Sequence, residues 1–238
     1  MRAVSRESYN ERALKSGRLT WEKLSDVIQH WQADRGLVAD GYFGEASDAE
    51  WQRQFAPRFV DPGEPSLIAE YAVQVAIEEL GNGEEFRNNA GPHLHRYRDY
   101  PYGDDYRRQI GEWCAFFAGH CYEKGAERAN MALPFERRFH DSRFNRRMPV
   151  GSAKSLGKRI GKAGQFVDVG LARRGDCIVW DRGRSGSPAG HVGIIERVDY
   201  DERLIHTIEG NVGAFPAKVR RRTWDADRPG RLEFVARI

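Results

Sequence analysis

The last third of the chain holds four short segments rich in β-branched and aromatic residues, and this clustering constrains the fold more than any other feature. Turn-forming residues separate these segments, which cover residues 175–181, 191–199, 203–210 and 232–238. Helical patterns precede them, over 67–80, from the stretch around Trp113 to Gly125, and near 151–161. Because helices come first and strands last, the sequence predicts an α+β fold with helices packed on one face of an antiparallel sheet.

A stretch with three prolines and a glycine, residues 56–66, divides the chain and is the best linker candidate. Upstream of it, Thr20 is expected to cap a helix whose apolar residues recur at three- and four-residue spacing, and residues 45–55 are expected to form a second helix. Residues 82–110 are rich in Gly, Asn, Pro and Tyr and are interpreted as long loops. We predict four parts: a polar segment 1–17, a helical domain 18–58, a linker 59–66 and a main domain 67–238.

Composition excludes several classes of protein. The 238 residues are 40% hydrophobic and carry a net charge of +3, which fits a globular chain and is too weak a bias to indicate nucleic acid. Three cysteines without a CxxC pair argue against a disulfide scaffold or a four-cysteine zinc site. No apolar run reaches the ~20 residues of a membrane span, and the first residues lack the apolar core of a Sec signal.

A predicted hairpin places an imidazole beside two polar side chains. If residues 191–199 and 203–210 pair around Tyr200 and Asp201, paired positions sum to about 401, which puts His191 opposite position 210, between Glu209 and Asn211. A register error of one residue still leaves one of these two side chains facing His191. A base held by a third group is the arrangement that nucleophilic catalysis requires.

Cys114 is the matching nucleophile candidate. It lies near the start of its predicted helix, where free N–H groups and the helix dipole favour a thiolate and could stabilise an oxyanion. Cys121 lies two turns deeper and Cys177 lies within a strand, so we expect both to be inert. The alternative is that all three are small buried core residues, and spacing alone does not decide between the two.

Four ordered motifs resemble the CHAP domain, the cysteine- and histidine-dependent amidohydrolase/peptidase of the NlpC/P60 superfamily. They are "EWCAFFAGHCYEKG", "RRGDCIVWD", "GHVGIIERVD" and "IEGN". The resemblance implies a papain-like α+β fold and hydrolysis of an amide bond in peptidoglycan, with Cys114 as nucleophile, His191 as general base, and Glu209 and Asn211 as the groups that orient the histidine. Since Trp113 stands where many members carry another residue, we assign the oxyanion to the backbone N–H of Cys114. Substrate-binding residues are expected at four positions: Trp113, Trp180, Tyr102 and Asn89.

The segment "HWQADRGLVADGYFGEAS" resembles the type 1 peptidoglycan-binding domain, although Glu45 stands where that family usually has proline. The resemblance implies a wall-binding role, for which we name Trp31, Asp40, Tyr42 and Phe43. The alternative is a helical cap without a ligand, in which the aromatic residues form a core.

Other charged or ligand-like groups are interpreted as structural or solvated. His93 and His95 could hold a metal only if they shared a strand face, and the acids Asp99, Asp104 and Asp105 alternate poorly for calcium. His206 should face away from Glu209 because strand residues alternate. The basic runs near residues 136–147 and 218–222 lack any nucleic-acid motif. We therefore expect no metal, no cofactor and no nucleic acid.

Together these features predict a monomeric peptidoglycan hydrolase that is made in the cytoplasm and reaches the wall through a holin or a secretion system. Whether it is an endopeptidase or an N-acetylmuramoyl-L-alanine amidase stays open. A non-catalytic wall-binding protein and a cysteine hydrolase of a non-wall amide are the rival hypotheses.

Overall fold

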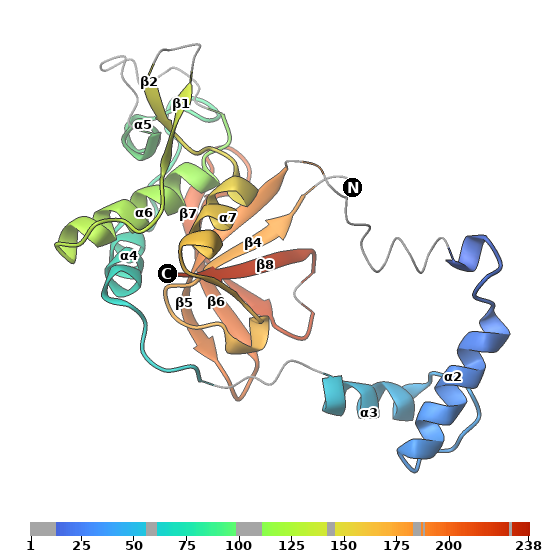
Figure 1. The fold of residues 1–238 in the computed structure, drawn as a ribbon. Helices are drawn as coiled ribbons and strands as arrows, with labels where there is room; N and C mark the ends of the chain where they lie inside the picture. Colours follow the sequence, from blue (N-terminus) through green and yellow to red (C-terminus); the bar gives the residue numbers. More distant parts are fainter. Residues whose placement is uncertain are drawn as a thin grey trace. The chain divides into compact units, whose positions relative to one another are not determined.

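The computed structural model describes residues 13–55, 61–98, 111–141, 146–182, 187, 189–228 and 230–238, with only the backbone of 52–55, 139–141 and 146–148. The chain forms two compact units, Met1–Ala56 and Pro57–Ile238, and each is described by itself (Figure 1). Among these residues no helix has the length and apolar character needed to cross a bilayer.

The described part of the first unit includes the helices α2 (Trp21–Asp34) and α3 (Glu45–Phe55). Thr20 caps α2 as predicted, because its hydroxyl accepts a hydrogen bond from the Lys23 N–H at 3.2 Å. The described residues of this unit contain no strand, which agrees with the helical region predicted upstream of the linker.

The second unit is built on a six-stranded antiparallel sheet with the strand order β3-β8-β4-β5-β6-β7. Its strands are β3 (Gln165–Val167), β4 (Cys177–Asp181), β5 (Gly190–Asp199), β6 (Leu204–Val212), β7 (Lys218–Asp225) and β8 (Leu232–Arg237). This sheet follows the main helices in sequence, so the predicted α+β class is confirmed.

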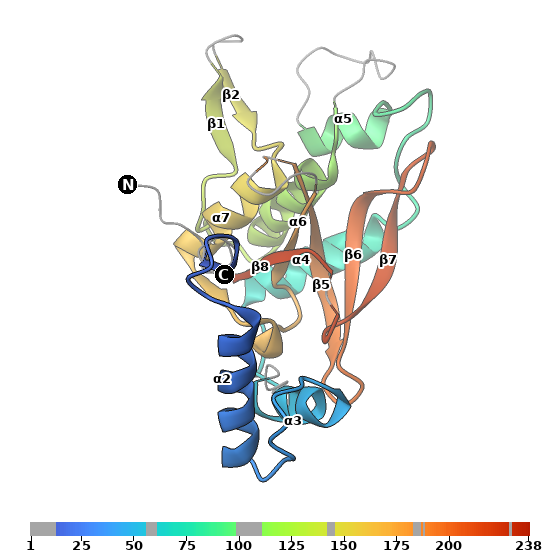
Figure 2. The same cartoon turned by 90° about the vertical axis from the view of Figure 1, so that its right-hand side faces the viewer.

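Helices α4 (Leu67–Glu78), α6 (Cys114–Arg128) and α7 (Ala153–Ala163) share the main core with the sheet (Figures 1 and 2). Gly125 allows α6 to approach α4, because a Cβ at this position would lie 2.6 Å from the Ile68 carbonyl oxygen. The prediction that Gly125 ends the helix is therefore wrong: the glycine is a packing position, and α6 continues to Arg128.

Several elements were missed or misassigned from sequence. The predicted loop 82–110 contains a short helix, α5 (Pro92–Arg98), which begins at a proline that suits a first helical turn. A separate hairpin is formed by β1 (Arg138–Asp141) and β2 (Arg146–Pro149). Residues 218–222 of strand β7 were interpreted as a solvated basic run, because they show no apolar alternation. In the structure, Arg220 to Thr223 are all exposed.

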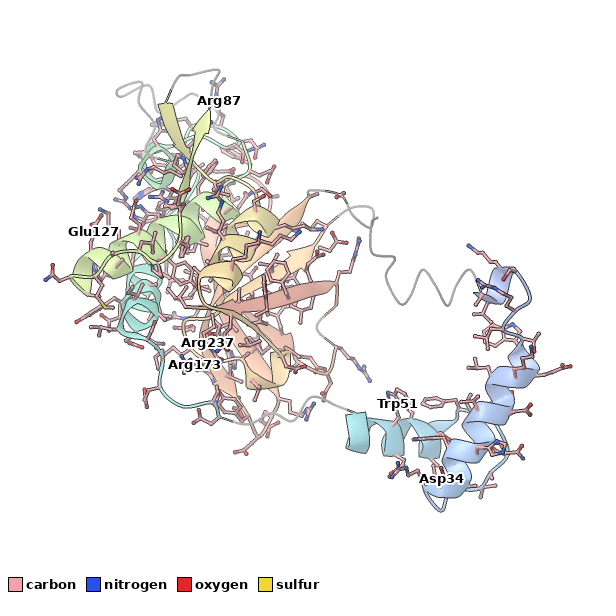
Figure 3. All side chains as sticks on the ribbon, viewed as in Figure 1. Asp34, Trp51, Arg87, Glu127, Arg173 and Arg237 are labelled. Carbon is pink, nitrogen blue, oxygen red and sulfur yellow. The ribbon has the colours of Figure 1, made fainter. Side chains whose placement is uncertain are left out.

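A buried ion pair fixes the turn that enters β4. The Asp176 carboxylate accepts hydrogen bonds from the Arg237 guanidinium at 2.9 and 2.8 Å and from the Arg173 N–H at 2.9 Å. Figure 3 labels Arg237 and Arg173, which lie together where β8 ends. The Tyr122 hydroxyl of α6 donates to the carbonyl of Gly175 at 2.8 Å. The "GD" motif thus joins β4 to β8 and to the helix that carries Cys114.

Candidate active site

Cys114 is the first residue of α6, and its side chain is a free thiol that is 4% exposed. Trp113 precedes it as N-cap and supplies no side-chain hydrogen bond to the helix. The backbone N–H groups of the first turn have no acceptor within an α-helix, so they are oriented toward the space next to the thiol. Cys114 therefore lies where the sequence placed it, at the end of the helix that favours negative charge.

His191 lies on β5 and is almost completely buried. Its Nε2 donates a hydrogen bond to Glu209 Oε2 on β6 at 2.7 Å. Its Nδ1 has no hydrogen-bond partner among the described residues. The Cys114 thiol lies close enough to the imidazole to raise the pKa of His191. The structure thus brings Cys114, His191 and Glu209 together, from one helix and two strands.

The pKa values of the two buried partners move in opposite directions. Burial lowers the pKa of His191, but hydrogen bonding and charge interaction with Cys114 and Glu209 outweigh burial and raise it. Burial raises the pKa of Glu209, but hydrogen bonds from His191, Thr207 and Trp224 outweigh burial and hold it below its usual value. Both effects favour an imidazolium next to a carboxylate, which is the charge state that a thiolate–imidazolium pair needs.

The register of the hairpin differs slightly from the prediction. Gly193 pairs with Glu209, so paired positions near the site sum to 402, and an irregularity between Ile195 and Arg197 shifts the pairs beyond it. Gly193 is required here, because a Cβ would lie 2.8 Å from Glu209 Cγ. His206 contacts Thr223 on β7 at 3.0 Å.

Asn211 does not contact His191 in this structure. It adopts a left-handed backbone conformation with φ 61°, and its amide donates to the carboxylate of Glu112. Of the two groups expected to orient the histidine, Glu209 makes the hydrogen bond, and Asn211 instead connects the end of β6 to the loop before Cys114. Sequence reasoning did not single out Glu112, although it stands two residues before the nucleophile.

A pocket of about 370 Å³ opens at Cys114. Its other lining residues come from the loop before α6, the start of α7, the end of β4 and the start of β5: Glu112, Gly151, Ser152, Ala153, Arg182, Ala189 and Gly190. Of the expected substrate-binding residues, the three that the structure describes do not line it. Its volume falls within the range of ligand pockets in proteins.

Three of those expected substrate-binding residues are buried, and Tyr102 lies outside the described residues. Trp113 is fully buried, stacks on Tyr97, and donates to Glu84 at 3.4 Å. Trp180 is 5% exposed and packs on His191. Asn89 is 9% exposed, and its N–H donates to Glu84 at 2.7 Å. A substrate cannot reach side chains enclosed in this way, so their placement does not support the expected role.

The other two cysteines are enclosed in the core. Burial raises the pKa of the Cys121 and Cys177 thiols, which keeps them protonated and unreactive. His93 and His95 lie on helix α5, where residues two apart point in different directions. In the part of the chain that the structure describes, no three or more His, Cys, Asp or Glu side chains gather as a metal site. Asp99, Asp104 and Asp105 fall outside that part.

In the first unit, buried Gln32 organises the loop between α2 and α3. Its amide nitrogen lies within hydrogen-bond distance of Asp40 Oδ1, the Tyr42 carbonyl and Ser47 Oγ, at 3.0, 2.9 and 2.8 Å. Its amide oxygen accepts from the Gly41 N–H at 2.8 Å. This network explains physically why the motif combines Gln, Asp-Gly and Ser at these spacings.

The residues named for wall binding divide into two kinds. Trp31 and Phe43 pack together with Trp51, with ring centroids 5.8 to 6.1 Å apart, and so form a small aromatic cluster. Asp40 holds the turn, whereas Tyr42 is 77% exposed beside a pocket of about 180 Å³. Tyr42 is therefore the most exposed aromatic side chain among the four, since Phe43 is 43% exposed and packs against Trp31.

The second unit is an α+β domain in which Cys114, His191 and Glu209 lie together, and comparison with known families gives its class. The family model of the CHAP domain matches residues 101–211, which include α6, β4, β5 and nearly all of β6. The resemblance seen in the four motifs is thereby confirmed. CHAP domains are typically amidases or peptidases, and the match points to the hydrolases that act on peptidoglycan. No curated protein and no solved structure gave a match.

Proposed function

We propose that the chain is a cysteine-dependent peptidoglycan hydrolase that cleaves an amide bond in the stem peptide or at its junction with muramic acid. The observation that carries this proposal is the buried His191, bonded through Nε2 to Glu209 and interacting with the thiol of Cys114 at the start of α6. The CHAP match supports the substrate class.

In the proposed mechanism, His191 Nδ1 takes the proton of the Cys114 thiol, and the thiolate attacks the carbonyl carbon of the amide. The oxyanion that forms is stabilised by the Cys114 N–H at the helix start. His191 then gives its proton to the leaving amine as the C–N bond breaks and a thioester remains. Water, deprotonated by His191, hydrolyses the thioester and restores the thiol. Glu209 keeps the imidazole oriented with the proton on Nε2 throughout.

The first unit is proposed to hold the enzyme on the wall, as the resemblance of its motif implies. The exposed Tyr42 side chain beside the 180 Å³ pocket supports this role. We also propose that the enzyme reaches the wall through a holin or a secretion system. Purified residues 1–60 and their Tyr42→Ala variant, incubated with sacculi and sedimented, test the binding role. If residues 1–60 and the Tyr42→Ala variant both remain in the supernatant in equal amounts, the unit has no wall-binding function.

Mass spectrometry of sacculi digested by the wild type and by Cys114→Ala tests the catalytic proposal. New amino termini on stems still attached to glycan indicate an endopeptidase, and stems released from muramic acid indicate an amidase. Cys121→Ala is the matched control, because it removes a thiol two helical turns away that is buried and protonated. Equal products from the wild type and Cys114→Ala would contradict the mechanism. No product from several wall types would favour a binding protein or a non-wall amide as substrate.

A further inference from the structure

Trp224 contacts the catalytic group from a strand that lies beyond the matched residues 101–211. Its indole Nε1 donates to Glu209 Oε1 at 2.8 Å and lies 3.2 Å from Thr207 Oγ1. The ring reaches these atoms from β7, where Trp224 is paired with Ile205 of β6. Sequence reasoning missed it, because β7 was not recognised as a strand.

The carboxylate of Glu209 has no contact with water and depends on three donors. The exposed fraction of its side chain is 0%, Oε2 is bonded to His191, and Oε1 accepts from Thr207 at 2.6 Å and from Trp224. A buried carboxylate without such donors is strongly unfavourable and tends to take up a proton. The two donors on Oε1 also fix the plane of the carboxylate, and this plane sets the direction in which Oε2 faces the imidazole.

A second tryptophan offers a natural comparison. Trp180 packs between His191 and Trp224, with ring centroids 5.9 and 4.6 Å away. Its own indole Nε1 is buried and has no hydrogen-bond partner within the described part of the chain. Trp180 and Trp224 are therefore neighbours in one aromatic stack, but only the N–H of Trp224 reaches the catalytic carboxylate.

We propose that Trp224 is a positioning residue for the reaction, whose indole N–H holds Glu209 in the orientation that keeps His191 aligned with Cys114. The inference rests on the proposed function for the reaction itself. The titratable or charged groups that the described residues place around this carboxylate are His191 on β5, Cys114 beyond the imidazole, and two arginines on β7. Arg220 is paired with Glu209 itself, and Arg222 is paired with Thr207. The Arg222 guanidinium lies 4.5 Å from the centre of the Trp224 ring.

The test compares Trp224→Phe with Trp180→Phe in the full chain. Each change replaces an indole by a phenyl ring in the same stack, but only Trp224→Phe removes a hydrogen bond to Glu209. The first measurement is the rate of Cys114 alkylation by iodoacetamide against pH, with Cys114→Ala to confirm the labelled site. The second is kcat and KM on soluble wall fragments.

We expect Trp224→Phe to lower kcat about tenfold, the effect of losing one hydrogen bond to a charged group, with KM unchanged. Its alkylation profile should move to higher pH, because a carboxylate that has lost the donor fixing its plane faces the imidazolium less well and stabilises the imidazolium–thiolate pair less. Trp180→Phe should keep the wild-type alkylation profile, whatever its effect on packing. Equal profiles for the wild type and Trp224→Phe, or equal shifts for both variants, would overturn the proposal.

A measurement on the wild type covers the case in which Trp224→Phe does not fold. With ¹⁵N-labelled tryptophan, one indole N–H resonance should move with pH together with the alkylation profile, and a spectrum in which none does so overturns the role of Trp224. Alkylation needs no substrate, so the outcomes stay separate. A wild type that is inert on every wall fragment refutes the proposed function. Equal alkylation profiles of the wild type and Trp224→Phe, or equal shifts in both tryptophan variants, refute only this inference.

Discussion

Replacing Glu209 by glutamine should inactivate the enzyme through the tautomer of His191 as well as through the loss of charge. Trp224 Nε1 can only donate, so the amide oxygen of the new glutamine must face Trp224, and its NH₂ group must face His191. His191 Nε2 then becomes an acceptor and the proton moves to Nδ1, where it prevents the imidazole from taking the proton of Cys114.

The size of the effect follows from the geometry. The His191–Glu209 bond is 2.7 Å long and both side chains are buried, so it belongs to the charge-assisted class, worth about 1.5–3 kcal/mol. That energy alone corresponds to a loss of about 10- to 100-fold in rate, and a wrong tautomer extends the loss toward about 10⁴-fold. The pKa of His191 should also fall, because burial still lowers it while one of the groups that raise it is gone. The alkaline limit of activity should therefore move to lower pH.

The assay is kcat/KM on soluble wall fragments across the pH range, for the wild type, Glu209→Gln and Glu209→Ala. Glu196→Gln is the control, because this residue lies on the same hairpin and pairs with Arg221 at the surface. Since alanine leaves the imidazole free to choose its tautomer, Glu209→Gln should be at least as inactive as Glu209→Ala. A Glu209→Gln enzyme with nearly wild-type rate and an unchanged pH profile would refute the reasoning.

Three further predictions concern the framework of the site. Burial lowers the pKa of His120 to about 4, so the unfolded chain binds more protons than the folded one between pH 4 and about 6.5. The free energy of unfolding should therefore fall by about 3 kcal/mol as the pH drops through that window. Urea unfolding should show a flatter pH dependence for His120→Leu than for the wild type. Gly193→Ala should cost about 1–3 kcal/mol and most of the activity, because its Cβ would displace Glu209; full activity by the fragment assay would contradict the close contact. Asp176→Ala should lower the free energy of unfolding by about 3–5 kcal/mol, because Arg237 keeps a buried charge without a partner, and an unchanged melting temperature would show that this ion pair is dispensable.

The positions of the proposed nucleophile and base could be predicted from sequence because each depends on local order, whereas their roles were implied by the CHAP resemblance. The position of Cys114 depended only on where one helix starts. The positions of His191 and Glu209 depended only on one hairpin with a short turn. Next to the turn, paired positions sum to 403 rather than the predicted 401. The irregularity between Ile195 and Arg197, which no residue pattern announces, brings the sum to 402 at the site. The choice between Glu209 and Asn211 required the backbone, since the left-handed conformation of Asn211 turns its side chain toward Glu112.

The residues that enclose the site were harder to predict because they depend on long-range pairing. Strand β7 exposes four consecutive residues from Arg220 to Thr223, so its sequence has the appearance of a charged surface run. Trp113 was expected to bind substrate, yet it lies in the core against Tyr97 at the start of α6. In both cases burial is set by elements far away in the sequence.

The position of β8 in the sheet has a consequence for synthesis of the enzyme. This strand, residues Leu232–Arg237, lies between β3 and β4 rather than at an edge, although it is the last strand along the chain. The helix with the thiol and the hairpin with the imidazole therefore leave the ribosome before β4 has its second neighbour. Pairing at such sequence separation is slow and comes late in folding. We expect a nascent chain to stay inactive until residues 232–237 have been made and have entered the sheet.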